Sequence, residues 1–268
     1  MPTFARGLWR IAAANVSSGN RVRLLHDGPE TFHAMRALID GAKESVNLES
    51  YIFHSDEVGE QFATALKAAA DRGVDVRVIT DAIGAREASR AFFADLRRSG
   101  VDVRIFNPPG PRRWLGLIPR DHRKLLVVDD EAGITGGVGI GQEWMRGVQK
   151  VRHSRWRDTA LRIEGPAAMD MTEAFDHMWR RVTGERIARR QRFLRRPARG
   201  AHLDPSTHES ALVGIIEGEP LRQRVARALQ MQAIAAERSI WIASAYFIPS
   251  WSDNILWSFF YHVKSELR

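Results

Sequence analysis

The sequence contains no cysteine, so neither a disulfide bond nor a metal site with thiolate ligands is available to this chain. Its first 20 residues also lack a long apolar run. The stretch Ile11–Ala14, with Arg6 and Arg10 before it, is too short for a membrane span or for the apolar core of a secretory signal. We therefore expect no secretory signal, and the cytoplasm is the default compartment.

Lysine is scarce, with 5 Lys against 35 Arg among the 268 residues. Because arginine would usually meet a bare requirement for positive charge here, the lysine at position 124 indicates a use for a compact ammonium group. Lys124 lies two residues after His122, and in an extended segment these two side chains project to the same side. The following Leu125–Val128 has no polar alternation, which predicts a strand buried on both faces. We therefore expect the imidazole and the ammonium side by side at the entrance of a core strand.

Positive charge is distributed unevenly along the chain. The net charge is +8, and residues 180–199 alone contain nine arginines against one acid, Glu185. Such a segment attracts polyanions, so an anionic membrane surface and nucleic acid are both candidate partners, with a solvated linker as the alternative. The loop 107–121 mixes arginine with Trp and Leu, which is typical of a membrane-interface contact or a substrate lip, but also of a loop packed on the body. The residues predicted to contact a membrane or polyanion are Arg112, Arg113, Trp114, Arg189, Arg190, Arg195 and Arg196.

The composition, 44% hydrophobic and 27% charged, is that of a soluble globular protein with one large or two small domains. Over the first 106 residues, strands are expected to alternate with helices. The expected strands are 22–25, 45–53, 74–80 and 101–106, and the expected helices are 32–39, 57–71 and 86–98. This alternation predicts an α/β fold with parallel strands and helices on both faces of the sheet. Further strands are expected at 125–128 and 157–163. Between them lie residues 133–135, the glycine turn and a short helical stretch at 143–144, and a helix is expected at 166–181.

The spacing H-x-K-x4-D, formed by His122, Lys124 and Asp129, is the signature of the phospholipase D superfamily, and the chain resembles a member of it. A second match, Trp156-Arg-Asp-Thr159 followed by Leu161-Arg-Ile-Glu-Gly-Pro166, is similar to the bacterial cardiolipin synthase branch. The resemblance implies a phospholipase D-like sandwich, with a mostly parallel mixed sheet flanked by helices. It also implies a two-step phosphodiester exchange that uses no cofactor and no metal.

The resemblance assigns catalytic roles to individual residues. His122 would be the nucleophile that forms a phosphohistidine, and Lys124 would bind the phosphate. Asp158 would orient the imidazole and stabilise its cationic form, and Asp129 would brace the motif strand. A second imidazole is needed to protonate the leaving alkoxide, since two histidines can hold opposite protonation states near neutral pH.

The glycine-rich stretch Thr135–Gly141 contributes Gly137 and Gly139 to the expected substrate-binding residues. In the family's Gly-Gly-x-Asn pattern an amide side chain reaches the phosphate, but this chain has Gly139 at that position. Losing one such donor typically costs about 3 kcal/mol, or roughly a hundredfold in rate. Glu49 and Glu143 match acidic positions of the synthase branch and are grouped with the substrate-binding residues, without an assigned role.

A second copy of the pattern begins after the arginine-rich segment, because residues 216–220 parallel 25–29 and residues 239–246 parallel 45–51. Family members have two such halves, and each half carries its own motif. His262-Val-Lys264 is treated as coincidence, since the required Asp would fall at position 269. We therefore expect a truncated second repeat and half of an active site.

The expected domains are a first half at 1–183, a basic linker at 184–209 and an incomplete second half at 210–268. The leading hypothesis is phospholipase D-type phosphatidyl transfer, namely cardiolipin synthesis from phosphatidylglycerol by a peripheral protein at the inner face of the cell membrane. One alternative is a single-motif phosphodiesterase or nuclease, in which a homodimer places one His122 from each chain across a two-fold axis. The partial second repeat argues against this alternative, and nucleic acid is the less favoured partner. Another alternative is a non-catalytic remnant that binds anionic membranes.

Overall fold

The computed structural model describes residues 14, 16–108, 120–145, 156–185, 210–218, 224–236 and 238–241. The chain divides into two compact units. One unit spans residues 14–222 and contains every strand of the described chain. The other comprises residues 1–13 and 223–268, and its described part includes helix α6 (Arg224–Ile234).

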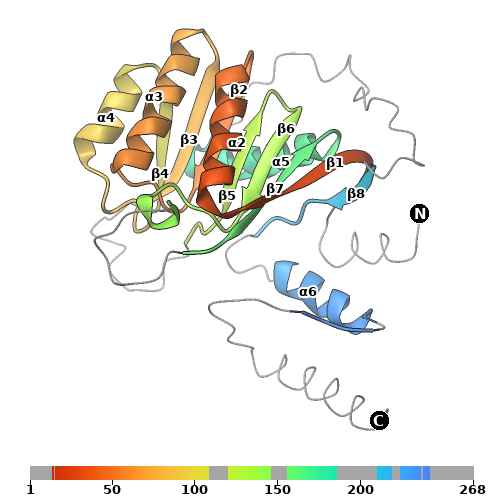
Figure 1. Cartoon of the computed structure of the whole chain (residues 1–268). Coiled ribbons are helices and arrows are strands. Elements are labelled where there is room, and N and C mark those ends of the chain that lie inside the picture. Colours follow the sequence, from red (N-terminus) through yellow and green to blue (C-terminus); the bar gives the residue numbers. More distant parts are fainter. Residues whose placement is uncertain are drawn as a thin grey trace. The chain divides into compact units, whose positions relative to one another are not determined.

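An eight-stranded mixed sheet forms the centre of the 14–222 unit (Figure 1). Its strand order is β4-β3-β2-β5-β6-β7-β1-β8. The strands are β1 (Val16–His26), β2 (Ser45–Ser50), β3 (Asp75–Asp81), β4 (Asp102–Phe106), β5 (Lys124–Val128), β6 (Ala132–Gly136), β7 (Thr159–Glu164) and β8 (Ala211–Gly214). The strand that carries Lys124 is therefore central in the sheet, between β2 and β6.

The α/β class and the mixed sheet agree with the sequence analysis, but the expectation of mostly parallel pairing needs correction. Among the described strands, β2–β3 and β3–β4 are the parallel pairs, and a helix connects the two strands of each pair. The other pairs are antiparallel, including β2–β5, β5–β6 and β6–β7. Strands β5 and β6 are joined by only three residues, and so short a connection permits only antiparallel neighbours. The first strand, β1, was expected to run parallel to its neighbours in the sheet. It lies instead between β7 and β8 and pairs antiparallel with both.

Helices cover both faces of the sheet, as expected. In Figure 1, α2 (Asp27–Gly41), α3 (Glu57–Asp71) and α4 (Arg90–Arg98) lie on one face, and α5 (Ala167–Thr183) lies on the other. Each face has its own apolar core. Helix α4 begins later than the predicted residue 86, because residues 82–88 form turns and Ser89 caps the helix by accepting a hydrogen bond from the Phe92 amide.

Strand β5 is buried on both faces, as its uniformly apolar sequence predicts. Leu126 and Val128 pack in the core below α2 and α3, whereas Leu125 and Val127 pack against α5. Because side chains alternate along a strand, the side chain of Lys124 points to the α2 side of the sheet, and that of Arg123 points to the α5 side.

The predicted division at residues 183 and 209 stays a prediction. The compact unit continues to Arg222, and β8, which the sequence analysis counts with the second half, pairs with β1 in the sheet of the first. None of the helices in the described part of the chain has both the length and the apolar character needed to cross a membrane.

Candidate active site

His122 and Lys124 lie side by side where the chain enters β5, as the alternation of side chains predicts. The Nζ atom of Lys124 is 3.3 Å from Nδ1 and 3.4 Å from Nε2 of the imidazole, and it donates a hydrogen bond to the His122 carbonyl at 3.0 Å. The ring of Tyr51 lies beside both groups, with its centroid 4.6 Å from that of His122 and 5.4 Å from Nζ of Lys124. The imidazole is exposed, so a substrate can reach it.

The surroundings of this pair disfavour positive charge on both members. Burial and the neighbouring ammonium lower the pKa of His122, although Asp121 and Asp81 oppose the shift. Burial lowers the pKa of Lys124 from 10.5 to about 8, against the opposing charges of Asp158 and Asp121. Near neutral pH the imidazole is therefore free to act as a nucleophile, while the lysine remains mostly cationic.

Asp158, just before β7, lies against the glycine-rich stretch. A Cβ atom on Gly137 would overlap the Asp158 carboxylate, so any larger residue at this position would have to displace that side chain. The carboxylate accepts a hydrogen bond from the Thr159 amide at 2.9 Å, and its charge raises the pKa of Lys124. Within the described residues, no hydrogen bond joins Asp158 to His122. The predicted orientation of the imidazole by Asp158 thus stays a prediction.

Asp129 lies at the far end of β5 and holds that strand to its neighbour. Its carboxylate accepts hydrogen bonds from the amides of Lys43, Glu44 and Ser45 at 2.8–2.9 Å, and its own amide donates to the Ser45 carbonyl. Because Ser45 begins β2, these bonds fix the relative position of two core strands. The catalytic importance of this bracing by Asp129 stays a prediction.

Arg123, between the two motif residues, forms a buried ion pair that the sequence analysis missed. Its guanidinium contacts both oxygens of Glu49, at 2.6 and 2.9 Å, and donates to the Ala174 carbonyl of α5 at 3.2 Å. Glu49 is fully buried, so it supports the motif strand from the α5 side, where a substrate cannot reach it. Burial and Asp121 raise the pKa of Glu49 well above its usual value, and Arg123 opposes the shift. Alternation along the strand could have indicated this pair, since a charge on the α5 side of a core strand requires a partner.

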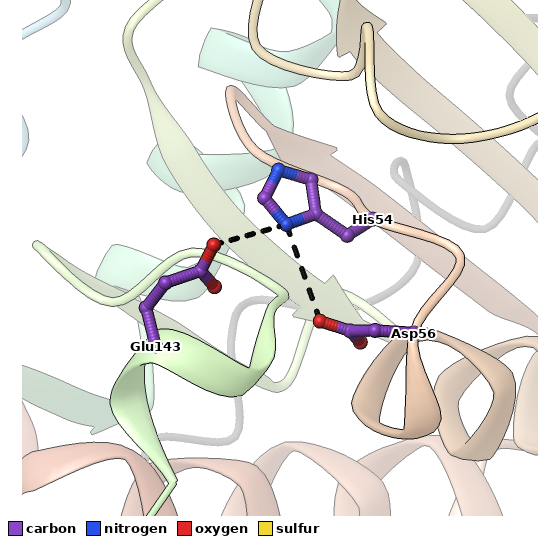
Figure 2. A group of neighbouring side chains, drawn as sticks. All are labelled: His54, Asp56 and Glu143. Carbon is purple, nitrogen blue, oxygen red and sulfur yellow. Dashed lines mark ion pairs between the residues drawn. The ribbon is translucent and has the colours of Figure 1, made fainter. Parts of the chain in front are cut away.

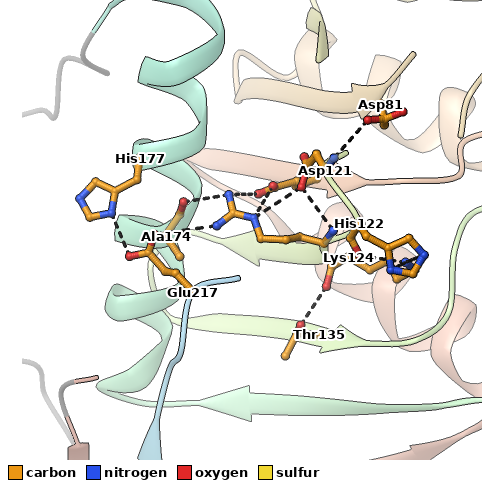
Figure 3. A network of polar contacts seen from close by, with 10 residues as sticks. Asp81, Asp121, His122, Lys124, Thr135, Ala174, His177 and Glu217 are labelled. Atoms are coloured by element: carbon orange, nitrogen blue, oxygen red, sulfur yellow. Dashed lines mark hydrogen bonds and ion pairs between the residues drawn. The ribbon is translucent and has the colours of Figure 1, made fainter. Parts of the chain in front are cut away.

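Further polar contacts extend this network under the motif (Figure 3). The Asp121 amide donates to Asp81 at 3.1 Å, and the Asp121 carboxylate accepts from the Arg123 amide at 3.3 Å. Glu217, beyond β8, lies 2.9 Å from Nδ1 of His177 and 3.9 Å from Arg123. Residues of β2, β3 and α5 and of the segment after β8 therefore hold the strand from which His122 and Lys124 project.

Gly139 lies within the glycine-rich stretch, and Glu143 follows its end. A Cβ atom on Gly139 would lie 2.8 Å from the Trp144 ring and 3.0 Å from Ile52, so an asparagine there would have to displace one of them. Glu143, on the short 3-10 helix η1 (Gln142–Trp144), pairs with His54 at 3.1 Å (Figure 2). Its carboxylate thus faces His54 within the described structure, and its predicted role in substrate binding stays a prediction.

The seven residues predicted to contact a membrane or polyanion lie outside the described residues. They are Arg112, Arg113, Trp114, Arg189, Arg190, Arg195 and Arg196.

Comparison with known proteins identifies close relatives. The family model described as "Cardiolipin synthase, PLD-like domain" matches residues 35–179. A cardiolipin synthase of Geobacillus kaustophilus is 34% identical over 245 residues, which are 90% of this chain and 47% of that protein. A cardiolipin synthase of Listeria monocytogenes is 32% identical over 238 residues, which are 88% of this chain and 48% of that protein. The chain spans about half the length of the curated relatives it matches.

Among solved structures, the phospholipase D family member Nuc from Salmonella typhimurium aligns with a TM-score of 0.44 and 23% identity. The alignment covers 60% of this chain and 94% of that one, a likeness too distant to support a functional argument. The family model, in contrast, spans more than half of the chain and includes the His122–Lys124 strand, β2 to β7 and most of α5. The chain therefore belongs to the cardiolipin synthase family of phospholipase D-like domains.

Proposed function

We propose that the chain provides one half of an active site for phosphatidyl transfer, in which cardiolipin is formed from phosphatidylglycerol. The observation that carries the proposal is the solvent-accessible imidazole of His122, which lies 3.3 Å from Nζ of Lys124. Partial desolvation and this neighbouring ammonium lower the pKa of His122, which favours its neutral form. A neutral imidazole beside a cation is the combination that attack on an anionic phosphodiester requires, and the family to which the chain belongs supports the same reaction.

In the first step, a ring nitrogen of His122 attacks the phosphorus of phosphatidylglycerol. The bond between phosphorus and the headgroup oxygen breaks, and glycerol leaves after it receives a proton from a general acid. In the second step, a hydroxyl of another phosphatidylglycerol attacks the phosphohistidine and gives its proton to the same group, now a base. The new phosphodiester forms, and His122 is released unchanged. Lys124 neutralises the phosphate oxygens throughout.

The general acid has to be a second group, because His122 is bonded to phosphorus when the leaving oxygen needs its proton. We infer that a second imidazole from outside this sequence supplies it. The curated relatives are about twice as long as this chain, which favours a second half over a second copy as the source. A homodimeric phosphodiesterase with two His122 residues is the alternative, and the mass of the active species in solution separates the two.

The proposed site of action is the inner face of the cell membrane, where the arginine-rich segment 180–199 would meet anionic headgroups. The nine arginines of this segment support such binding, at roughly 1 kcal/mol for each charge near the surface. Vesicles of phosphatidylglycerol should therefore bind the chain with an affinity that falls as salt rises. If DNA displaces the chain at low concentration, a nucleic-acid substrate is favoured instead.

The chemistry can be tested with an activated diester, since a p-nitrophenolate leaving group departs without a proton. We expect intact-mass analysis to show one phosphoryl adduct on the chain, and we expect the adduct to disappear in His122→Ala. An adduct that persists in His122→Ala would refute the role of His122. Rapid cardiolipin formation by the monomeric chain alone would refute the need for a second imidazole.

A further inference from the structure

A second cluster of titratable side chains lies apart from His122, where three segments meet. His54 follows β2, Asp56 caps α3, and Glu143 belongs to η1 (Figure 2). Nδ1 of His54 lies 3.1 Å from Oε1 of Glu143 and 4.0 Å from Oδ2 of Asp56. One potential ligand atom from each of the three residues lies within 4.8 Å of the other two.

The charges of this cluster do not balance. His54 is only 8% exposed, and it faces a third carboxylate, that of Glu87, at 3.9 Å from Nε2. The Glu87 side chain is 61% exposed, so solvent screens its charge. Among His54, Asp56 and Glu143, which are buried or half-buried, even a protonated imidazole would leave one negative charge in excess. Such an excess is costly unless a cation compensates it.

One oxygen of Glu143 also lacks a partner. Its Oε2 atom is buried and accepts no hydrogen bond within the described residues. Gly141 leaves the space for this oxygen, because a Cβ atom there would overlap it and would lie 3.1 Å from Nδ1 of His54. The unsatisfied oxygen of Glu143 and Nδ1 of His54 thus both lie beside Gly141, which has no side chain to fill the space between them.

From this geometry we propose that His54, Asp56 and Glu143 bind a divalent transition-metal ion, with Zn²⁺ or Mn²⁺ as the best match to one nitrogen and two carboxylate ligands. Bonds of about 2.1 Å would bring the ligand atoms to about 3.4 Å from one another. The amides of Gly59 and Gln142 hold the Asp56 carboxylate at 2.9 and 2.7 Å, so this change would come from rotation of the Glu143 carboxylate. Water would complete the coordination, since Asp56 and Glu143 are partly exposed. The ion would join η1 and the glycine-rich stretch to the start of α3. It would take no part in the chemistry at His122.

Isothermal titration calorimetry of the whole, metal-stripped chain with Zn²⁺ and with Mn²⁺ tests the proposal. Glu143→Gln and Asp56→Asn each remove one charge and preserve shape, and asparagine still caps a helix. We expect one site in the unaltered chain and at least tenfold weaker binding in each variant. His54→Gln should have the same effect. Because His54 is buried, the two carboxylate variants decide the result if His54→Gln fails to fold.

The matched control is His177→Gln, because His177 makes a similar contact with a single carboxylate, 2.9 Å from Glu217. Binding should be unchanged in this variant. The visible spectrum of the Co²⁺ form should also lose intensity in Glu143→Gln and keep it in His177→Gln. Absence of binding by the unaltered chain, or equal affinities in Glu143→Gln and the unaltered chain, would refute the metal site and leave a plain His54–Glu143 ion pair.

Discussion

At the scale of single residues, the reactivity of the site depends on the protonation of His122 and Lys124, which burial and the short distance between the two groups both affect. The two nitrogen-bearing groups lie 3.3 Å apart, so protonation of one opposes protonation of the other. This coupling gives the site a pH dependence that can be measured on either side chain.

The first prediction concerns the pH range of the nucleophile. Because burial and Lys124 lower the pKa of His122, its imidazole should titrate below 6.5, and Lys124→Met should move the midpoint upward. With the pKa of Lys124 at about 8, the rate of adduct formation should rise as His122 loses its proton and fall as pH passes through about 8. NMR titration of the His122 ring checks the first part. A midpoint that stays in place in Lys124→Met would show that the two charges are not coupled.

The second prediction concerns Gly137, which touches the Asp158 carboxylate. Gly137→Ala should displace that carboxylate and slow formation of the His122 adduct by at least tenfold, because a shift of about 1 Å in a site is enough for such a loss. Gly41→Ala is the matched control, since a Cβ atom at Gly41 meets nothing within 4 Å. Equal rates in the two variants would mean that the close approach at Gly137 has no bearing on catalysis.

At the scale of elements, β5 depends on the ion pair between Arg123 and Glu49, which connects it to β2 and α5. Glu49 is fully buried and the Arg123 side chain is 15% exposed, so their opposite charges compensate each other where water has little access. The strand thus presents its reactive side chains on one face and is held in place by charge on the other.

The third prediction follows from this pair. Glu49→Gln or Arg123→Met alone should lower the free energy of unfolding by about 3–5 kcal/mol, because each removes the main counter-charge of the remaining partner. The double variant should be less destabilised than the sum of the two single variants. Asp95→Asn, which breaks the more exposed pair with Lys67, should destabilise the protein much less than either single variant, because solvent screens that pair. Denaturant unfolding checks all four proteins, and additive effects at Glu49 and Arg123 would exclude a coupled pair.

At the scale of the whole molecule, the chain continues past the arginine-rich segment and returns to the first sheet through β8. Strand β8 and Glu217 both follow this segment. Strand β8 pairs antiparallel with β1, and Glu217 contacts His177. The unit that holds the candidate site therefore includes residues that follow the predicted linker.

The fourth prediction combines the predicted linker with this pairing. Trypsin should cut first between residues 186 and 199, where arginines are frequent and apolar periodicity is weak. The two fragments should then remain together in size-exclusion chromatography under native conditions, because β8 pairs with β1. Separation of the fragments would contradict that pairing, and equal resistance along the whole chain would contradict the linker.

The sequence by itself determined the features that depend on neighbours along the chain. Apolar periodicity placed helix α3 at its observed limits, and the uniformly apolar Leu125–Val128 indicated a strand buried on both faces. Alternation placed His122 and Lys124 on one side, and the spacing to Asp129 led to the family. These signals are local, since a repeat of two or about 3.6 residues sets which side chains share a face.

Only the tertiary structure decided which distant segments meet. The position of β1 between β7 and β8, the pairing of Arg123 with a residue 74 positions away, and the meeting of His54 with Glu143 have no counterpart in local periodicity. Periodicity reveals that a side chain is buried, but the partner of a buried charge depends on how the sheet is ordered and on which loops close over its edge. The physical reason is that strand order is a global choice, made by the packing of all the elements together.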